Sequence, residues 1–267
     1  MLWVQAHGLN YLQFPLLAGL PGFFHGIFLR RALDLQGQME DFNLGLGCGT
    51  PDDQVRFNRQ RMLDLFGRGH VGVYARQVHG TQVGVWNSES TPSDAIRLNG
   101  DALVTARDSG ALVIQTADCQ SVIVIDPIRR VVANIHSGWR GSIANIIGRT
   151  IATMAAQFAC RPRDLLCGIG PSLGPCCAEF VNYRTEIPEP YWNYRVNRHH
   201  FDFWALSRDQ LISAGLQSAH IQVSQICTRC NSQRFFSYRA NRITGRFGAV
   251  IGIRNESPPS GAPRQPL

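Results

Sequence analysis

Three side chains with the chemistry of metal ligands each lie at the end of an apolar run. They are His79 in Gln77-Val-His-Gly80, Cys119 in Thr116-Ala-Asp-Cys119 and His136 in Ile135-His-Ser-Gly138. A thiolate and two imidazoles suit Zn²⁺, and three protein ligands leave the fourth tetrahedral position for water. This arrangement is typical of a catalytic zinc rather than a structural one, and it indicates an enzyme.

The three residues lie far apart in the chain, because 119 − 79 = 40 and 136 − 119 = 17. Zinc fingers use much closer Cys and His pairs, so the fold must assemble this site. Each residue also has a simpler interpretation: His79 as a core histidine and Cys119 as a small buried hydrophobe. The neighbouring Asp118 is a candidate proton acceptor or a partner for a ligating imidazole, or it caps its turn.

The segment Ser137-Gly-Trp-Arg-Gly141 after His136 adds a second chemical element. Exposed N–H groups at a helix N-terminus, together with Arg140, would form a site for an anion such as phosphate. The alternative is a tight turn from strand to helix in which Gly138 and Gly141 serve only backbone geometry. That alternative explains the glycines and leaves Arg140 unexplained.

The remaining cysteines give a weaker signal. Cys227-Thr-Arg-Cys230 matches the C-x-x-C pattern of redox dithiols and half zinc sites, but no second C-x-x-C completes a ribbon site. Cys176-Cys177 is a vicinal pair in a loop rich in Gly and Pro. The sequence favours a structural packing role for both pairs.

The charge balance favours anionic partners. Lys and Arg number 26 against 19 Asp and Glu, a net charge of +7, and the pI is about 9.2. The basic residues are scattered, so phosphate-bearing metabolites fit better than nucleic acid. Arg234, Arg239 and Arg246, around the aromatic run 235–238, could reach a polar ligand, although solvated hairpin arginines are commoner.

The elements that must position these residues are helices and strands in alternation. A first helix is predicted with Thr50 as its N-cap and Pro51 at its first position, and it ends near Gly67. Its core-facing residues are predicted to be Val55, Met62, Leu63 and Phe66. A second helix follows residue 141, with apolar residues at helical spacing from Ile143 to Phe158.

The centre of the chain carries the densest strand signal. Short β-branched runs at 111–115, 121–125 and 131–135 predict a meander whose ends carry the metal ligands. Further strands are predicted at 165–170 and 249–253, and a helix at 202–214 closed by Gly215. The fold class is therefore α/β with mixed rather than purely parallel sheets, flanked by helices.

The length of 267 residues and a hydrophobic content of 44% fit one large domain. We assign this domain to residues 1–254 and expect residues 255–267, rich in Pro, Ser and Gly, to be disordered. The apolar stretch 14–24 is broken by prolines and a glycine, so neither a signal peptide nor a membrane span is predicted. The eight cysteines do not suggest a disulfide-stapled domain, and we expect a cytoplasmic protein with reduced thiols.

Taken together, the motifs resemble the laccase-domain (polyphenol oxidase-like) family of zinc-dependent purine nucleoside phosphorylases. The resemblance runs in order from about His25 to Ile253. It rests on the segments Gln77-Val-His-Gly80, Asp101-Ala-Leu-Val-Thr105, Thr116-Ala-Asp-Cys119, His136-Ser-Gly-Trp-Arg-Gly141, Gly168-Ile-Gly-Pro171, Gly174-Pro-Cys-Cys177 and Phe235-Phe-Ser-Tyr-Arg239.

The resemblance implies a compact, single-domain α/β sandwich that phosphorolyses adenosine, inosine, guanosine and methylthioadenosine, and that also deaminates adenosine. It implies zinc held by His79, Cys119 and His136, with purine nucleosides and phosphate as partners and no nucleic acid or membrane. Asn43, Asn58 and Arg59 match the family's substrate-side elements. The sequence departs from the family at Asp41 and at Thr50-Pro51, positions that bear on nucleoside preference rather than on the metal.

Three other functions are compatible with parts of the sequence. A copper polyphenol oxidase would normally use His-x-His pairs, and the sequence contains none. A cysteine-dependent amidase or hydrolase could use Cys119 as nucleophile with His79 or His136 as base. A non-catalytic module that binds metal or nucleic acid is the third alternative.

Overall fold

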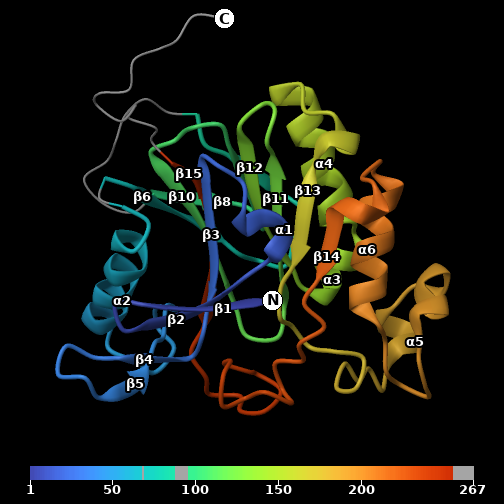
Figure 1. Cartoon of the computed structure of the whole chain (residues 1–267). Helices are drawn as coiled ribbons and strands as arrows, with labels where there is room; N and C mark the ends of the chain where they lie inside the picture. The colour runs from blue at the N-terminus through green and yellow to red at the C-terminus, as the bar shows by residue number, and fades with distance from the viewer. Residues whose placement is uncertain (68, 88–95, 255–267) are drawn as a thin grey trace, which may run out of the picture.

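The computed structural model describes residues 1–67, 69–87 and 96–254. The predicted disordered tail at 255–267 lies outside the described residues. In the described part of the chain, the helices are all too short or too polar to cross a membrane. Figure 1 shows the elements stacked in layers, with helices on the two outer sides of the strands.

The first layer of strands is a mixed sheet that, in the described chain, has seven strands. Its order is β1 (Leu2–Ala6), β2 (Leu9–Gln13), β3 (Phe23–Phe28), β15 (Phe247–Ile253), β10 (Gly110–Thr116), β6 (Val71–Arg76) and β8 (Ile96–Asn99). β10 lies in the centre, with Leu112 opposite Ile251 of antiparallel β15 and opposite Val73 of parallel β6.

The second layer is a six-stranded mixed sheet within the same described ranges. Its order is β14 (Ile221–Val223), β13 (Leu166–Ile169), β11 (Gln120–Asp126), β12 (Val131–Ser137), β9 (Ala102–Thr105) and β7 (Val83–Val85). A separate antiparallel ribbon pairs β4 (Arg31–Leu33) with β5 (Met39–Asp41). Both large sheets contain parallel and antiparallel pairs, which confirms the prediction of mixed sheets.

Six α-helices in the described residues flank the two sheets. They are α1 (Pro15–Ala18), α2 (Asp52–Asp64), α3 (Trp139–Ile143), α4 (Ile146–Phe158), α5 (Tyr183–Glu186) and α6 (Phe203–Ser213). α2 lies on one side of the molecule, whereas α4 and α6 lie on the other (Figure 1). Short 3₁₀ turns occur at Pro162–Asp164, Glu189–Tyr194 and Ser218–His220.

The continuous apolar runs of the central strands arise because both faces of each sheet are covered. Successive side chains of a strand point to opposite faces. In β11, Ile123 packs into the core between the sheets, and Val124 packs against the helices. In β10, Leu112 joins the same central core, and Val113 packs in the cluster that contains Met62 of α2. The result is a helix–sheet–sheet–helix sandwich.

The predicted strand meander is wrong in one respect. The strands exist as β10, β11 and β12, but β10 pairs with β15 and β6 in the first sheet, whereas β11 pairs with β12 in the second. The connection between β10 and β11 therefore crosses from one sheet to the other. This connection includes Asp118, whose backbone is left-handed with φ of 90°. Because β15 and β6 already pair with the two edges of β10, β11 pairs in the other sheet.

The predicted helix after residue 141 is divided into two. α3 ends at Ile143 and α4 begins at Ile146. Asn145, at the break, is left-handed with φ of 57°, and its side chain caps α4 by accepting a hydrogen bond from Gly148 N. Periodicity alone could not find this break, because the apolar spacing continues across it.

The other predicted elements are confirmed with small shifts at their ends. The predicted first helix is α2, and its four predicted core residues are all buried. Pro51, rather than Thr50, occupies the N-cap position of this helix. The predicted strands at 165–170 and 249–253 are β13 and β15, and the helix at 202–214 is α6, capped by Asp202.

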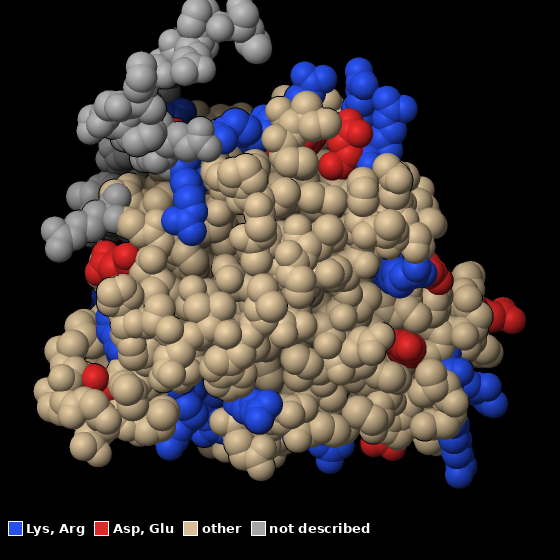
Figure 2. All heavy atoms as spheres, viewed as in Figure 1, with Lys and Arg blue, Asp and Glu red and all other residues tan. Residues whose placement is uncertain are grey.

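The basic surface consists entirely of arginine, because the 26 basic residues are all Arg and the sequence has no lysine. Figure 2 shows these residues scattered around the rim of one face, with no single tract among them. The centre of that face carries few charged side chains.

Candidate active site

The three candidate metal ligands come from both sheets and meet where the sheets adjoin. His79 follows β6 of the first sheet, Cys119 lies in the connection from β10 to β11, and His136 lies in β12 of the second sheet. His79 has a left-handed backbone with φ of 62°, a conformation that few residues other than glycine adopt. The fold holds this unfavourable turn at the site.

The three side chains converge as the sequence predicted. Each offers one ligand atom, and these atoms all lie within 4.8 Å of one another. The sulfur of Cys119 lies 3.7 Å from Nε2 of His79, and the two imidazole rings meet edge to face with centroids 4.8 Å apart. His136 is buried, Cys119 is half-buried and His79 is exposed, so the group opens toward solvent on one side.

Asp101 holds both histidines in place. Its Oδ1 accepts hydrogen bonds from Nδ1 of His136 at 2.8 Å and from the backbone N of His79 at 2.8 Å. Its Oδ2 accepts from the backbone N of Gly80 at 2.8 Å. With Nδ1 of His136 engaged, Nε2 is the nitrogen left for a metal, which is the usual arrangement of a ligating histidine.

The charge of Asp101 is secured by these contacts. Burial alone would raise the pKa of this carboxyl, but the hydrogen bonds from His136 and the backbone N–H groups lower it to about 2. Asp101 was not predicted to be a site residue, although it begins the motif Asp101-Ala-Leu-Val-Thr105. An acid immediately before a buried apolar strand was the available signal.

Cys119 is biased toward its thiolate form. Burial would raise the pKa of this thiol, but the positive charge of His136 and hydrogen bonds from both histidines lower it to about 6. Burial would lower the pKa of His136, yet the Cys119 thiolate and Asp101 raise it to about 9. A thiolate is the form that binds metals and the form that acts as a nucleophile.

Gly138 is required by the space around the ligands. An ideal Cβ at this position would lie 2.6 Å from Cδ2 of His79 and 3.2 Å from the Cys119 sulfur. The φ of Gly138 is an ordinary −75°, so side-chain clearance rather than backbone freedom explains the glycine. Any larger residue would push the ligands apart.

The ligands open into a cavity of about 880 Å³. Its walls include aromatic, acidic and basic side chains together with the three candidate ligands. Thr116 also lines the cavity, and its buried hydroxyl has no hydrogen-bond partner in the described structure. The charged and aromatic lining residues are Arg97, Asp118, Trp139, Glu179, Phe180, Glu186, Phe203, Tyr238, Arg239, Arg242 and Arg246.

Some of the arginines named from the sequence line the cavity and others do not. Arg140 is exposed, stacks on Trp139 at 4.6 Å and is absent from the described residues that line the cavity, as is Arg234. Arg239 and Arg246, both named from the sequence, do line it. Arg97 and Arg242 line it too, and neither was predicted, because tertiary folding alone brings them here.

Asn43 and Arg59 support a wall of the cavity from behind. Oδ1 of Asn43 accepts hydrogen bonds from the backbone N of Gly45 at 2.9 Å and of Arg246 at 2.7 Å. Arg59 donates from Nε to the carbonyl of Leu44 at 2.9 Å, and Asn58 donates to the carbonyl of Asn43 at 3.1 Å. These contacts fix the loop whose Gly45 lines the cavity.

Asp118 lines the cavity and ties two other segments to the site. Its Oδ1 accepts from the Thr228 hydroxyl at 2.6 Å, and its Oδ2 accepts from the backbone N of Arg239 at 2.7 Å. Asp101, rather than Asp118, is the partner of the His136 imidazole. The geometry thus places Asp118 beside the ligands and gives its carboxylate a positioning task.

The layered fold and the convergent side chains define an α/β sandwich with a candidate metal site at a cavity where its sheets adjoin. The chain belongs to the family described as multi-copper polyphenol oxidoreductase laccase, whose model matches residues 24–254. The family predicted from the motifs is thereby confirmed.

Known proteins similar to this chain carry a different functional name. The chain is 30% identical to purine nucleoside phosphorylase YlmD of Geobacillus stearothermophilus, covering 88% of this chain and 92% of that protein. It is 31% identical to a purine nucleoside phosphorylase of Xylella fastidiosa, covering 79% and 84% respectively. The crystal structure of YlmD from Geobacillus stearothermophilus superposes with a TM-score of 0.79 at 27% identity, covering 94% of this chain and 98% of that one.

Proposed function

We propose that this protein is a zinc-dependent purine nucleoside phosphorylase. The observation that carries the proposal is the convergence of His79, Cys119 and His136 at a cavity lined by arginines and aromatic rings. The names of the similar proteins supply the reaction class. One thiolate, two imidazoles and an open side suit a catalytic zinc.

The cavity has the size and chemistry for the two substrates. Its volume of about 880 Å³ falls within the range of roughly 300–1,000 Å³ typical of small-molecule sites. Phe180 and Tyr238 offer rings against which a purine base can stack. Arg239, Arg242 and Arg246 offer planar guanidinium groups, which bind phosphate through paired hydrogen bonds.

Phosphorolysis breaks the bond between C1′ of the ribose and the purine nitrogen and joins C1′ to a phosphate oxygen. Positive charge develops on the sugar during this step, and an anion held nearby stabilises it. We assign this positioning of phosphate to Arg239, Arg242 and Arg246. Asp118 would fix the backbone of Arg239. A zinc ion at the three ligands would supply Lewis-acid polarisation of the reacting group.

Adenosine deaminase and methylthioadenosine phosphorylase activities are finer parts of the same proposal. Both use purine nucleosides of similar size, and the same cavity would accommodate them. Asp101 would hold His136 in the tautomer that ligates the metal in every one of these reactions. We further propose that Asn43 and Arg59 act by shaping the wall at Gly45.

A cysteine-dependent hydrolase is the second candidate, and one observation favours it. The Cys119 sulfur lies 3.7 Å from Nε2 of His79, and the pKa of this thiol is lowered to about 6, as expected for a nucleophile beside a base. A multi-copper oxidase has less support, because the described residues provide a single mixed His and Cys group.

Product chromatography after incubation with each nucleoside and phosphate tests the proposal. Zinc-loaded protein should release the free base and the corresponding sugar 1-phosphate from adenosine, inosine, guanosine and methylthioadenosine. Inosine formed from adenosine would reveal the deaminase. The variants His136→Ala and Cys119→Ser should lose the zinc of this site and turnover while keeping the wild-type circular dichroism spectrum.

Each alternative has its own test. Full turnover by a zinc-free variant would contradict the metal assignment. Cleavage of amide substrates by the metal-free protein, abolished by alkylation of Cys119, would favour the hydrolase. Oxygen consumption with phenols that requires added copper would favour the oxidase.

A further inference from the structure

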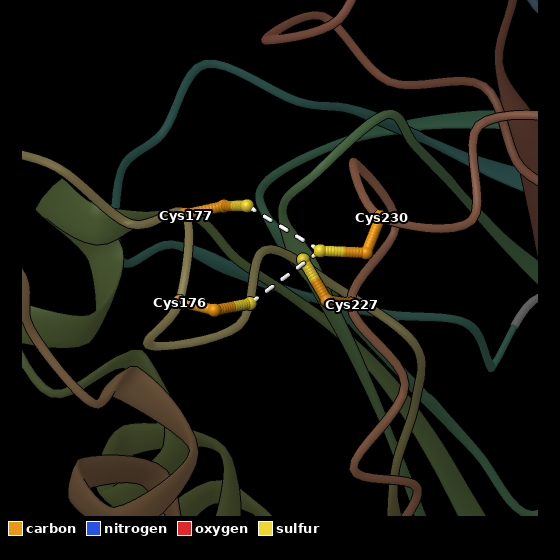
Figure 3. A group of neighbouring side chains, drawn as sticks. All are labelled: Cys176, Cys177, Cys227 and Cys230. Carbon is orange, nitrogen blue, oxygen red and sulfur yellow. Dashed lines mark hydrogen bonds between the residues drawn. The ribbon is translucent and has the colours of Figure 1, made fainter.

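A second group of possible metal ligands lies outside the His and Cys site. Cys176 and Cys177 meet Cys227 and Cys230, and the four sulfur atoms all lie within 4.8 Å of one another. Figure 3 shows the four side chains pointing toward a common centre from two loops. The vicinal pair thus completes the C-x-x-C motif, a role that sequence spacing alone did not indicate.

The sulfur separations fit a single tetrahedral ion. Zinc binds thiolates at about 2.3 Å, which places the sulfurs of a regular tetrahedron about 3.8 Å apart. The Cys230 sulfur lies 3.6 Å from the Cys176 sulfur and 3.6 Å from the Cys177 sulfur. All four cysteines are free thiols, so these distances separate neighbouring thiols that are not joined by disulfide bonds.

Backbone contacts hold the two loops at this spacing. The backbone N of Ser172 donates to the carbonyl of Ile226 at 3.2 Å, and that of Thr228 donates to the carbonyl of Ser172 at 3.0 Å. An ideal Cβ on Gly174 would lie 3.1 Å from Cβ of Cys227. The loops therefore approach each other closely because a glycine stands at the crossing.

Backbone N–H groups point at the buried end of the group. Those of Cys230 and Gly174 donate to the Cys227 sulfur. Hydrogen bonds of this kind to a ligand atom are typical of the surroundings of a metal site.

We propose that Cys176, Cys177, Cys227 and Cys230 bind a structural Zn²⁺ ion. Four protein ligands fill the tetrahedral shell and leave no position for substrate, which distinguishes a structural from a catalytic zinc. Soft thiolate ligands in this geometry select zinc over the hard cations Mg²⁺ and Ca²⁺. This site goes beyond the proposed nucleoside chemistry and does not depend on it.

The position of the four cysteines indicates what a bound ion would stabilise. Leu173, Ala178, Glu179 and Phe180, on either side of the vicinal pair, line the active-site cavity. The backbone carbonyl of Asp118 accepts from the N of Leu173 at 2.8 Å, and its side chain accepts from Thr228. The ion would therefore tie the loop that forms this part of the cavity wall to the loop that carries Cys227 and Cys230.

Metal analysis of the purified full-length protein tests the proposal without reference to activity. The wild type should contain two zinc ions per chain, one at each of the two ligand groups. Cys230→Ser, at an exposed ligand, should lose one of them, and His136→Ala should lose the other. Cys48→Ser, outside both groups, is the matched control and should retain both.

Thiol titration of the wild type gives a second readout that no folding defect can obscure. Cys176 and Cys230 are exposed, yet bound zinc should protect them from a thiol reagent until a strong chelator is added. Immediate reaction with only one zinc per chain would overturn the proposal. Protection relieved by a reductant rather than a chelator would indicate a disulfide and overturn it, and iron in place of zinc would contradict the metal assigned.

Discussion

Asp101 links the two histidines of the site through one buried carboxylate. It accepts hydrogen bonds from Nδ1 of His136 and from the backbone N–H groups of His79 and Gly80, which follow β6. The ligands themselves could be predicted, because two His and a Cys at the ends of apolar runs suit zinc and the motifs around them resemble a zinc-dependent family. Asp101 could not, because its partners come from distant segments that only the fold brings together.

The first prediction concerns this carboxylate. Asp101→Asn removes the negative charge and offers an amide in its place, so the His136 imidazole is no longer held with its Nε2 free for the metal. Zinc affinity should fall by about 10- to 100-fold, measured by competition with a chromophoric chelator. The exposed Asp53→Asn is the control. Equal zinc affinities in the two variants would contradict a role for Asp101 in positioning His136.

The second prediction concerns Gly138. In Gly138→Ala the new methyl group would lie 2.6 Å from the His79 ring, so the ligands must separate. A misplacement of about 1 Å can cost about 100-fold in rate, and we expect a loss of that order in kcat/KM with weaker zinc retention. Gly19→Ala meets nothing within 4 Å and serves as the control. Wild-type zinc content and rate in Gly138→Ala would contradict the steric argument.

At the level of elements, the site depends on connections that change sheets. The chain passes from β10 in the first sheet to β11 in the second through Cys119, and from β8 to β9 through Asp101. Apolar runs predicted the strands correctly but not their partners, because strands buried on both faces look alike in sequence. Arg97 and Arg242 of the cavity wall were equally hidden, since their positions depend on loop packing.

The break between α3 and α4 gives the third prediction. Asn145 is left-handed at φ of 57° and caps α4 through its side chain, so Asn145→Ala loses the cap and strains the backbone. We expect thermal or urea unfolding to report a loss of about 1–2 kcal/mol. Asn145→Gly should cost only a few tenths of a kcal/mol, because glycine adopts the left-handed backbone without strain and is itself accepted at an N-cap. A larger loss with Gly than with Ala would refute this explanation of the break.

The whole molecule is held by a central core between two sheets, and one histidine lies buried at its margin. His25 in β3 is 1% exposed, and its Nε2 accepts a hydrogen bond from the backbone N of Phe14 at 2.9 Å. Burial lowers its pKa from 6.5 to about 4, so the folded protein keeps this ring neutral.

The fourth prediction is a dependence of stability on acid. The unfolded chain gains a proton on His25 as the pH falls through 6.5, whereas the folded chain gains it only near 4. The stabilisation is thus complete above pH 6.5 and is lost progressively between pH 6.5 and 4, by about 3 kcal/mol in all. In His25→Gln, the free energy of unfolding in urea should depend less steeply on pH between pH 6.5 and 4. In the exposed His7→Gln, it should depend on pH as in the wild type. Parallel curves for wild type and His25→Gln would contradict the assignment.

The dependence of base release on phosphate tests the central claim most directly. Zinc-loaded protein with inosine should form hypoxanthine and ribose 1-phosphate in equal amounts when phosphate is present, and neither when it is absent. Arg239→Ala should raise the phosphate concentration needed for half-maximal rate. Hypoxanthine with free ribose in phosphate-free buffer, or no base release at any phosphate concentration, would contradict the assignment of this cavity to a phosphorylase.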